Sequence, residues 1–370
     1  MNIFVEDIKQ DVIIGIDLYS FEVKAAQPFF GVKNVPLLPT LHVIHFQQTE
    51  NGLRYGYWFE TDQNAYMQFQ YDATKELFVP KYQIDDQSRN DAYNRFQKTQ
   101  HLMIAYPSVD EEDRWHELTK HVRWSAVKHS TASGGYFAYV DSVMTTTEEN
   151  NLLSKVLANR CESSKREIVV PDTEAVLNYT PIVFKSTEAI RPQYKMEDFL
   201  DKSWYLGHVI LPRYHHNSFY ALLGEFQWAF LNAMLFANYG SSLQWHSILE
   251  LVCFSSTIAP EHVRAFDEVV AHQLTVIPAP YCETLLNEQV WSKCMLRSFQ
   301  AIALPHTTRE LEKTIPDVLA DIPDSEERDY APGTRFSGAH PGVNLNEHTI
   351  GSDSDDDGPV VVERICYTPL

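Results

Sequence analysis

The period of hydrophobic and polar positions changes along this chain, from short alternating segments near the start to helical spacing beyond Met196. Between residues 12 and 84, β-branched and aromatic segments are separated by Pro, Gly, Asn and Asp, a pattern typical of strands and turns. These segments are VIIGID, LHVIHF, LRYGYWFE, AYMQFQY and LFVPKYQI. Asn51-Gly52 lies between the second and the third, and predicts a hairpin because a type I′ turn needs positive φ at both central residues.

Helical patterns follow. They cover roughly residues 88–105 and 110–122, before another predicted strand at 136–142. From Phe219 to Ala237 hydrophobic residues recur at helical spacing, and Gly240 stands where this helix is expected to end. The next helices are predicted over SSLQWHSILELVCF, between Pro260 and Pro278, and over 281–303 and 307–320. The short connections predict a compact bundle of about five or six helices.

We therefore expect an α+β multidomain protein. It has a β-rich N-terminal domain with a few helices (1–159), a flexible linker (160–177), an all-α helical C-terminal domain (178–320) and an acidic disordered tail (321–370). The linker loses all periodicity over CESSKREIVVPDTEAVLN. In the tail, acidic residues far outnumber the basic ones, while glycines and prolines oppose regular structure.

The tail ends in a β-forming segment, residues 359–368. Its hydrophobic residues favour a pleated, half-buried surface, whereas the preceding run SDSDDDG stays solvated. Two interpretations are open: the segment adds a strand to the sheet of a partner protein, or it is a frayed terminus without function. On the first interpretation the partner-binding residues are Val360, Val361, Val362, Ile365 and Tyr367.

Composition and charge restrict the function. The 370 residues, 44% of them hydrophobic, are sufficient to fill two cores. A formal charge of −20 without a large basic run argues against direct contact with nucleic acid. We also expect no membrane contact and an intracellular location, because no apolar stretch matches a bilayer span or a signal peptide. The five cysteines lack any CxxC pair and are expected to be reduced thiols.

Candidate chemistry is sparse. His42 and His45 have an odd spacing in a predicted strand, so their rings point to opposite faces and cannot share a metal; we expect packing or surface roles. His215 and His216 lie in a loop without further ligands, and we expect them to be exposed. The sequence contains no GxSxG, P-loop, GxGxxG, HExxH or kinase signature. We expect no catalytic residue, metal, cofactor or small-molecule substrate; a hydrolase with a dispersed triad is the alternative.

Several long segments resemble the AAR2 family of spliceosomal assembly factors, in its yeast-type form. The similarity runs from about Ile14 to the end of the predicted helical domain. The segments are GIDLYSFEVKAAQPFFGVKNVP, RYGYWF, YVDSVMTTTEEN, NYTPIVFKSTEAIRPQYKMEDFLDKSWYL, GEFQWAFLNAMLFANYGSSLQWHSILEL and LLNEQVW. The chain departs from the family at residues 36–40, PLLPT, where many members carry a Pro-Pro-Gly turn.

The resemblance implies a non-catalytic assembly chaperone in pre-mRNA splicing, which acts in U5 snRNP biogenesis in the cytoplasm and the nucleus. It implies binding to the RNase H-like and Jab/MPN domains of the scaffold protein PRP8 within a precursor U5 snRNP. Bound there, the protein would block premature binding of the BRR2 helicase. The resemblance also favours the partner-strand interpretation of the tail. A generic interaction adaptor is the alternative, beside the hydrolase.

Five hydroxyl residues are candidate phosphorylation sites. The resemblance implies a regulated turn that falls on Ser255, Ser256 and Thr257, with Ser256 the best single candidate and Ser255 the next. Simple capping by these hydroxyls is the structural alternative. A phosphate added here would face the negative end of the preceding helix and repel a docked partner, which implies release. Ser352 and Ser354 precede aspartates, a pattern that acidophilic kinases favour. The alternative is that this segment is a constitutive solvated spacer that only sets the reach of the tail.

Overall fold

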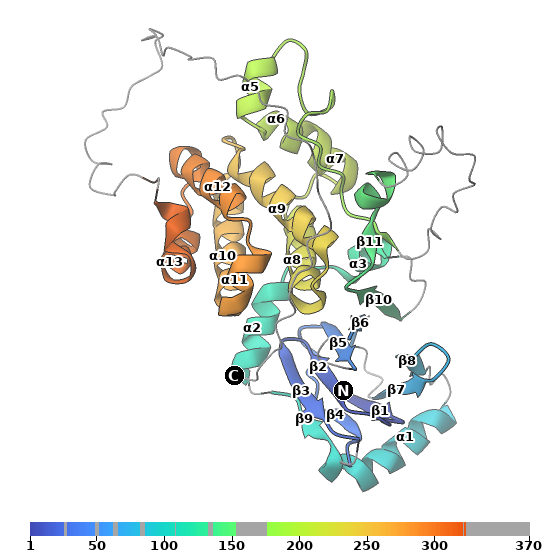
Figure 1. The fold of residues 1–370 in the computed structure, drawn as a ribbon. Coiled ribbons are helices and arrows are strands. Elements are labelled where there is room, and N and C mark those ends of the chain that lie inside the picture. The colour runs from blue at the N-terminus through green and yellow to red at the C-terminus, as the bar shows by residue number, and fades with distance from the viewer. Residues whose placement is uncertain are drawn as a thin grey trace, which may run out of the picture.

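The structure is a computed structural model, which describes residues 1–25, 28–48, 52–61, 66–81, 86–107, 109–131, 136–152, 176–320 and 322. It confirms the predicted α+β class, with two β-sheets at one end of the molecule and a stack of helices at the other (Figure 1). Helix α2 lies between the two ends and contacts both α8 and α10 (Figure 1). The predicted tail lies outside the described residues, apart from Ile322.

The strands are β1 (Asn2–Glu6), β2 (Val12–Ile16), β3 (Tyr19–Val23), β4 (Gly31–Lys33), β5 (Leu41–Gln47), β6 (Arg54–Glu60), β7 (Tyr66–Asp72), β8 (Leu77–Lys81), β9 (Ile104–Ala105), β10 (Phe137–Asp141), β11 (Thr145–Thr146) and β12 (Val176–Leu177). The first helices are α1 (Asp86–Thr99), η1 (Gln100–Leu102), α2 (Val109–Thr119) and α3 (Trp124–Ser130), and residues 147–152 are also helical. The later helices are α5 (Lys195–Leu200), α6 (Ser203–Tyr205), η2 (Leu206–Ile210), α7 (Leu211–Tyr214), α8 (Phe219–Phe236), α9 (Tyr239–Cys253), α10 (Pro260–Val276), α11 (Ala279–Leu285), α12 (Glu288–Ala301), α13 (Pro305–Thr314) and η3 (Pro316–Leu319).

Ten strands form two five-stranded sheets, which we call the outer and the central sheet. The outer sheet has the order β8-β7-β1-β4-β9, and the central sheet has the order β10-β6-β5-β2-β3. Strands β5 and β6 pair antiparallel from Leu41↔Glu60 to Gln47↔Arg54, which confirms that these two segments form a hairpin. The type I′ turn at Asn51-Gly52 stays a prediction, because Asn51 lies outside the described residues. Strand β1 was not predicted, because its five residues gain their partners only from β7 and β4, far away in sequence.

The central sheet is buried on both faces. Val43 and Trp58 point into the hydrophobic core formed with α8, while Ile44 and Phe46 pack toward the outer sheet. This double burial explains why successive residues of β5 are buried, whereas a strand with one solvated face would alternate between buried and exposed positions. A core shared by the sheet and the helices therefore lies across the predicted domain boundary.

The domain limits themselves stay predictions. Most of the predicted linker, residues 160–175, lies outside the described residues. Its last two residues, Val176 and Leu177, form strand β12, which pairs in parallel with β11. This short pair connects the start of the helical part to the strand that follows the central sheet.

Several predicted helix limits were wrong. The helix predicted at 88–105 ends at Thr99, and the residues after η1 form strand β9, which pairs in parallel with β4. The helix predicted at 281–303 is two helices, α11 and α12, separated by Leu286 and Asn287. The described residues from 178 to 320 hold nine α-helices, α5 to α13, instead of the predicted five or six. The sequence did not reveal α5, α6 and α7, because they are too short to show a hydrophobic period.

Gly240 was also wrongly predicted to end a helix. Helix α8 ends at Phe236, because Ala237 takes a left-handed conformation with φ of 53°, and Gly240 lies inside α9. Asn238 begins α9 as its N-cap, and its side-chain oxygen accepts from the Ser241 N–H at 2.9 Å. The sequence signal for this start was therefore the asparagine rather than the glycine.

We expect Asn238→Ala to lower the free energy of unfolding by about 2–3 kcal/mol, which combines a lost N-cap with unsatisfied buried carbonyl groups. The Asn238 amide also donates to the carbonyl oxygens of Asp141 and Met144, at 3.1 and 2.7 Å. Within the described part of the chain, the Asn287 side chain, the N-cap of α12, forms a single hydrogen bond, which it accepts from the Val290 N–H. Asn287→Ala is therefore the control, with an expected cost of about 1 kcal/mol. Equal losses in urea unfolding would contradict this prediction.

Candidate functional site

The predicted turn at Ser255, Ser256 and Thr257 joins the end of α9 to α10, and its three hydroxyl residues differ in exposure. Ser255 is fully buried, and its hydroxyl donates to the Leu251 carbonyl at 2.7 Å. Ser256 and Thr257 are exposed. A kinase can therefore reach the last two directly. The ranking of Ser255 as the second candidate was wrong, because its buried hydroxyl caps the final turn of α9.

The turn is bound to the segment that follows α5. The Ser256 hydroxyl donates to the carboxylate of Asp201, which also lies 3.4 Å from the Ser256 N–H. The Thr257 N–H donates to the Ser203 hydroxyl at 3.1 Å, and the Lys202 N–H donates to the Phe254 carbonyl at 2.8 Å. Four neighbouring polar contacts thus connect two segments about fifty residues apart in sequence. The sequence did not reveal Asp201 as a partner of this turn.

The charge state of Asp201 follows from these contacts. Burial would raise its pKa, but hydrogen bonds from Ser203 and Ser256 outweigh burial and lower the pKa below its usual value. The carboxylate is therefore ionised at neutral pH. An added negative charge on Ser256 would meet this ionised group at hydrogen-bonding distance, and would replace an attraction by a repulsion.

Helix α5, immediately before Asp201, presents an exposed hydrophobic surface. Met196, Phe199 and Leu200 have exposed fractions of 73%, 55% and 53%. Their spacing of three and four residues places them together on one side of the helix, which we call the α5 face. Three large exposed hydrophobic residues on one short helix are typical of a protein-docking surface. Because Asp201 follows α5 directly, the turn and the α5 face form one candidate site.

An ion pair between the half-buried Arg191 and the buried Asp198 orients α5. Arg191 binds Asp198 with two side-chain hydrogen bonds of 2.9 and 2.7 Å, and its own N–H donates to the same carboxylate at 2.8 Å. The hydrogen bonds from Arg191 lower the pKa of Asp198 despite burial. The Arg191 guanidinium also lies over the rings of Tyr194 and Trp204, at 4.1 and 4.9 Å. The α5 face is therefore presented by a rigid support.

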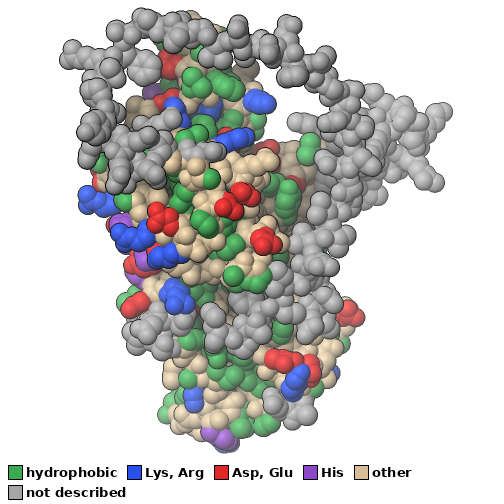
Figure 2. Space-filling view, turned by 60° about the vertical axis from the view of Figure 1, so that its left-hand side comes forward, with side chains coloured by type: hydrophobic (Ala, Val, Ile, Leu, Met, Phe, Trp, Pro, Cys, Tyr) green, Lys and Arg blue, Asp and Glu red, His purple; other side chains and the backbone are tan. Residues whose placement is uncertain are grey.

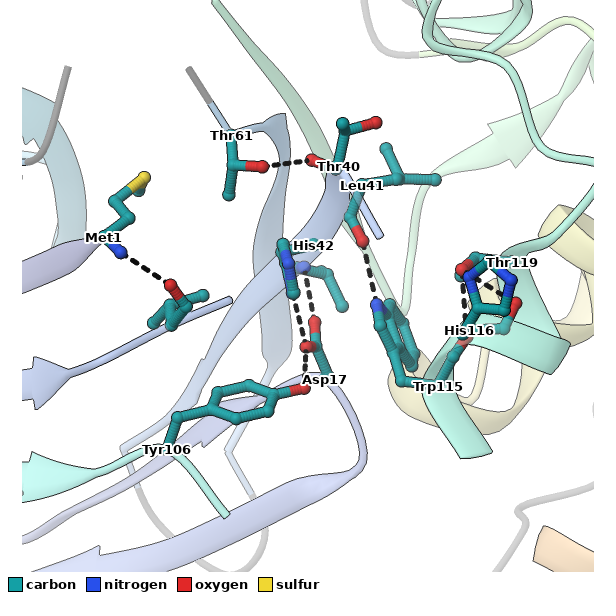
Figure 3. Close-up of polar contacts among 12 residues, drawn as sticks. Met1, Asp17, Thr40, Leu41, His42, Thr61, Tyr106, Trp115, His116 and Thr119 are labelled. Carbon is teal, nitrogen blue, oxygen red and sulfur yellow. Dashed lines mark hydrogen bonds and ion pairs between the residues drawn. The ribbon is translucent and has the colours of Figure 1, made fainter. Parts of the chain in front are cut away.

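His42 and His45 point to opposite faces of β5, as predicted, and both have packing roles. The Nδ1 atom of His42 lies 2.6 Å from Asp17, whose carboxylate also accepts from the Tyr106 hydroxyl at 2.6 Å (Figure 3). The His45 ring packs edge-on against Phe236 of α8. Asp17 and His42 resemble two members of a hydrolase triad, but Nε2 of His42 is buried and has no hydrogen-bond partner among the described residues. A nucleophile is therefore not assembled here.

His215 is the second histidine that could belong to a hydrolase triad. The prediction that it is exposed was wrong. His215 is only 4% exposed, whereas His216 is exposed as predicted. Nε2 of His215 lies 3.0 Å from the hydroxyl of Thr180, and this hydroxyl donates to Glu225 at 2.8 Å. In this arrangement the one proton of the Thr180 hydroxyl points to Glu225, so the hydroxyl accepts a hydrogen bond from the Nε2–H tautomer of His215, and this tautomer does not serve as its base. The cluster joins the segment after β12 to α8.

This burial gives a pH dependence. Burial, with His216 acting in the same direction, lowers the pKa of His215 to about 4. The unfolded chain takes up this proton near pH 6.5, so the stability from neutral His215 is lost as the pH falls from about 6.5 toward 4. We expect His215→Gln, whose amide can still donate to Thr180, to flatten the fall of the urea midpoint between pH 7 and pH 5. His101→Gln, at an exposed position of η1 away from this cluster, is the control. Parallel curves for wild type and His215→Gln would contradict this assignment.

A cavity of about 630 Å³ lies between the two parts of the molecule. Its wall comes from the β5–β6 hairpin, the residues after β10, the ends of α8 and α11, helix α9 and the start of α12. This volume is within the range of small-molecule and peptide sites. Hydrophobic wall residues include Met234, Phe236, Leu243, Leu285 and Val290. Neither the sequence patterns nor the family resemblance predicted this cavity.

The described residues contain no group of three or more His, Cys, Asp and Glu side chains that could hold a metal ion. Among the described helices, none is both long and apolar enough to cross a membrane. On the face shown in Figure 2, basic side chains lie among acidic and histidine side chains, and hydrophobic ones reach the surface between them. This part of the described surface is therefore mixed in charge rather than continuously basic.

The other predicted site residues lie outside the described residues. They are the partner-strand residues Val360, Val361, Val362, Ile365 and Tyr367, and the candidate phosphorylation sites Ser352 and Ser354. Of the predicted sites, the turn at Ser255, Ser256 and Thr257 lies within the described residues, and the structure places it beside the α5 face. The sequence did carry a signal for this face, because Met196, Phe199 and Leu200 have helical spacing between charged residues.

Comparison with known proteins covers nearly the whole chain. The model of the AAR2 N-terminal domain matches residues 2–132, and the model of the AAR2 C-terminal repeat region matches residues 179–329. The A1 cistron-splicing factor AAR2 of Saccharomyces cerevisiae is 39% identical over 360 residues, which cover 96% of each chain. The AAR2 homologs of Homo sapiens and Pongo abelii are each 21% identical over 311 residues, 77% of this chain and 78% of theirs.

Proposed function

Because this chain belongs to the AAR2 family and is similar to the yeast protein along almost its full length, we propose that it is a non-catalytic factor of pre-mRNA splicing. Its role is the assembly of the U5 snRNP. It binds the RNase H-like and Jab/MPN domains of PRP8 in a precursor particle, and it excludes the BRR2 helicase until phosphorylation releases it. It works in the cytoplasm and in the nucleus, through protein contacts alone.

The observation that carries this proposal is the extent of the match to the yeast splicing factor, which includes both family domains. The arrangement around α5 supports a binding role. An exposed hydrophobic face beside a turn with two accessible hydroxyl residues suits a docking site that a phosphate could disrupt. The two histidine clusters instead support the fold, since Nε2 of His42 has no hydrogen-bond partner among the described residues and Nε2 of His215 donates a hydrogen bond to the Thr180 hydroxyl.

The test is reconstitution of the full chain with a PRP8 fragment that contains the RNase H-like and Jab/MPN domains from the same organism. We expect a one-to-one complex in size-exclusion chromatography, and a BRR2 fragment should bind this complex more weakly than it binds PRP8 alone. A complex that admits BRR2 with unchanged affinity would contradict the proposed exclusion. The absence of any complex would contradict the proposed function itself.

A further inference from the structure

The cavity between the two parts of the molecule has an exposed hydrophobic rim. Val143, Tyr239 and Leu243 all contribute to its wall, with exposed fractions of 69%, 69% and 45%. Large exposed hydrophobic residues around a concave surface are typical of a site that another hydrophobic group covers. The rim therefore indicates an apolar occupant, of a size that fits about 630 Å³.

The charges of the wall add a second requirement. Among the wall residues, Arg54 is the one arginine or lysine, and Glu250 is the one aspartate or glutamate. Arg54 donates to Gln47 at 2.8 Å and to the Tyr281 hydroxyl at 2.7 Å. Within the described part of the chain, the Glu250 carboxylate accepts no hydrogen bond and forms no ion pair. Burial raises the pKa of Glu250, while the more distant Lys202 and Lys293 act in the opposite direction. An occupant with one cationic group would supply the missing partner.

We propose that residues 359–368 of the same chain occupy this cavity while no partner is bound, with Arg364 paired to Glu250. Arg364 is the only lysine or arginine after Arg335. In an extended segment, Val362 and Cys366 lie on the same side as Arg364 and would enter the apolar part of the cavity. The segment thus offers the combination that the cavity requires, a single cation between hydrophobic side chains.

The length of the chain permits this contact. Residues 323–358, 36 in number, lie between the last described residue, Ile322, and the proposed segment. A coil of 36 residues spans about 30–36 Å on average, whereas a domain of about 300 residues has a radius of gyration near 19 Å. The segment therefore reaches the cavity at an effective concentration of about a millimolar, so that modest intrinsic affinity is sufficient.

Occupation of the cavity would protect the segment from self-association while no partner is bound. A β-forming stretch such as VVVERICY is prone to self-association when it is free. If the proposed function holds, the same residues also bind the partner, so partner and cavity compete for them. The inference rests on the proposed function only for this last step, because occupation of the cavity involves this chain alone.

The test uses a fluorescein-labelled peptide of residues 357–370 and fluorescence anisotropy, without PRP8. We expect weak binding to the full chain, because its own segment fills the cavity. A full-length variant with Val362→Asp and Arg364→Glu should release the cavity and bind the peptide at least about tenfold more tightly. Adding Leu243→Glu at the rim should abolish that gain, whereas Leu296→Glu, on α12 outside the cavity, should preserve it.

A charge exchange tests the pairing itself. In a chain that lacks residues 359–368, Glu250→Lys should weaken binding of the wild-type peptide, and a peptide with Arg364→Glu should restore it. Equal peptide binding by the full chain and the released variant would overturn the proposal, as would unchanged binding after Leu243→Glu. If an apolar dye such as 1-anilinonaphthalene-8-sulfonate binds both chains equally and the peptide binds neither, the cavity takes another occupant. Failure of PRP8 reconstitution would leave all of these outcomes unaffected.

Discussion

Ser256→Glu is expected to weaken binding of the chain to the RNase H-like domain of PRP8 by about 10–100-fold, equivalent to about 1.4–2.7 kcal/mol. The substitution removes the hydrogen bond to Asp201 and puts a second carboxylate beside an ionised one. Two such charges about 4 Å apart repel by about 4 kcal/mol at an effective dielectric constant of 20, and solvent and salt reduce this value. The repulsion would separate the turn from the residues that follow α5, and so alter the α5 face.

Three variants distinguish this mechanism from simpler ones. Ser256→Ala loses the hydrogen bond without adding charge, and should cost less than about threefold in affinity. Combining Asp201→Asn with Ser256→Glu removes the repulsion between positions 201 and 256, so part of the binding affinity should return. Repulsion between the new carboxylate and the partner protein would remain. Ser255→Glu would instead bury a charge at a site with 0% exposure, so its expected effect is unfolding. Isothermal titration calorimetry should be accompanied by thermal unfolding, and equal affinities for Ser256→Glu and Ser256→Ala would refute the switch.

Deletion of residues 359–368 should weaken binding to the two-domain PRP8 fragment by about 100-fold, since the strand would lose both its backbone hydrogen bonds and its side-chain contacts. The described fold should be unaffected, because its core closes without this segment. Val361→Pro should reproduce much of the loss, since proline removes one backbone donor of a strand.

Val361→Thr is the matched control for the proline variant. It keeps β-branching and the backbone donor, so we expect a loss of less than about fivefold. Affinity should be measured by surface plasmon resonance against the two-domain fragment and against the isolated RNase H-like domain. If the deleted chain binds the two-domain fragment as tightly as the full chain, the segment is a frayed terminus and the partner-strand hypothesis is wrong.

The parts of the fold that depend on local pattern could be predicted from the sequence. The strands around the β5–β6 hairpin, and helices α8, α9 and α10, were recognisable because hydrophobic period, asparagine, glycine and proline give consistent local signals. Strand β1 was not recognisable, because its ladder with β7 joins residues about sixty positions apart. Helices α5 to α7 were missed because each has at most six residues, and Gly240 misled because Ala237 takes the left-handed conformation.

The candidate site was predictable only in part. The family resemblance directed attention to Ser255, Ser256 and Thr257, but no pattern shows that Asp201 meets Ser256 across a separation of 55 residues. The burial of Ser255 likewise depends on tertiary packing at the end of α9. His215 was misjudged for the same reason, since Thr180 and Glu225 become its neighbours only after folding. Contacts between distant segments decide these residues, and local sequence carries little information about them.

The shared core also affects how the chain is made. Trp58 of the central sheet donates a hydrogen bond of 2.9 Å to Asn232 of α8, and 174 positions separate the two residues. At a synthesis rate of about 5–20 residues per second, the ribosome needs roughly 9–35 seconds to add the residues between them. The hydrophobic face of the sheet stays without α8 during this interval. Nascent chains arrested before residue 219 should therefore recruit Hsp70-type chaperones, and chains arrested well after residue 253 should release them.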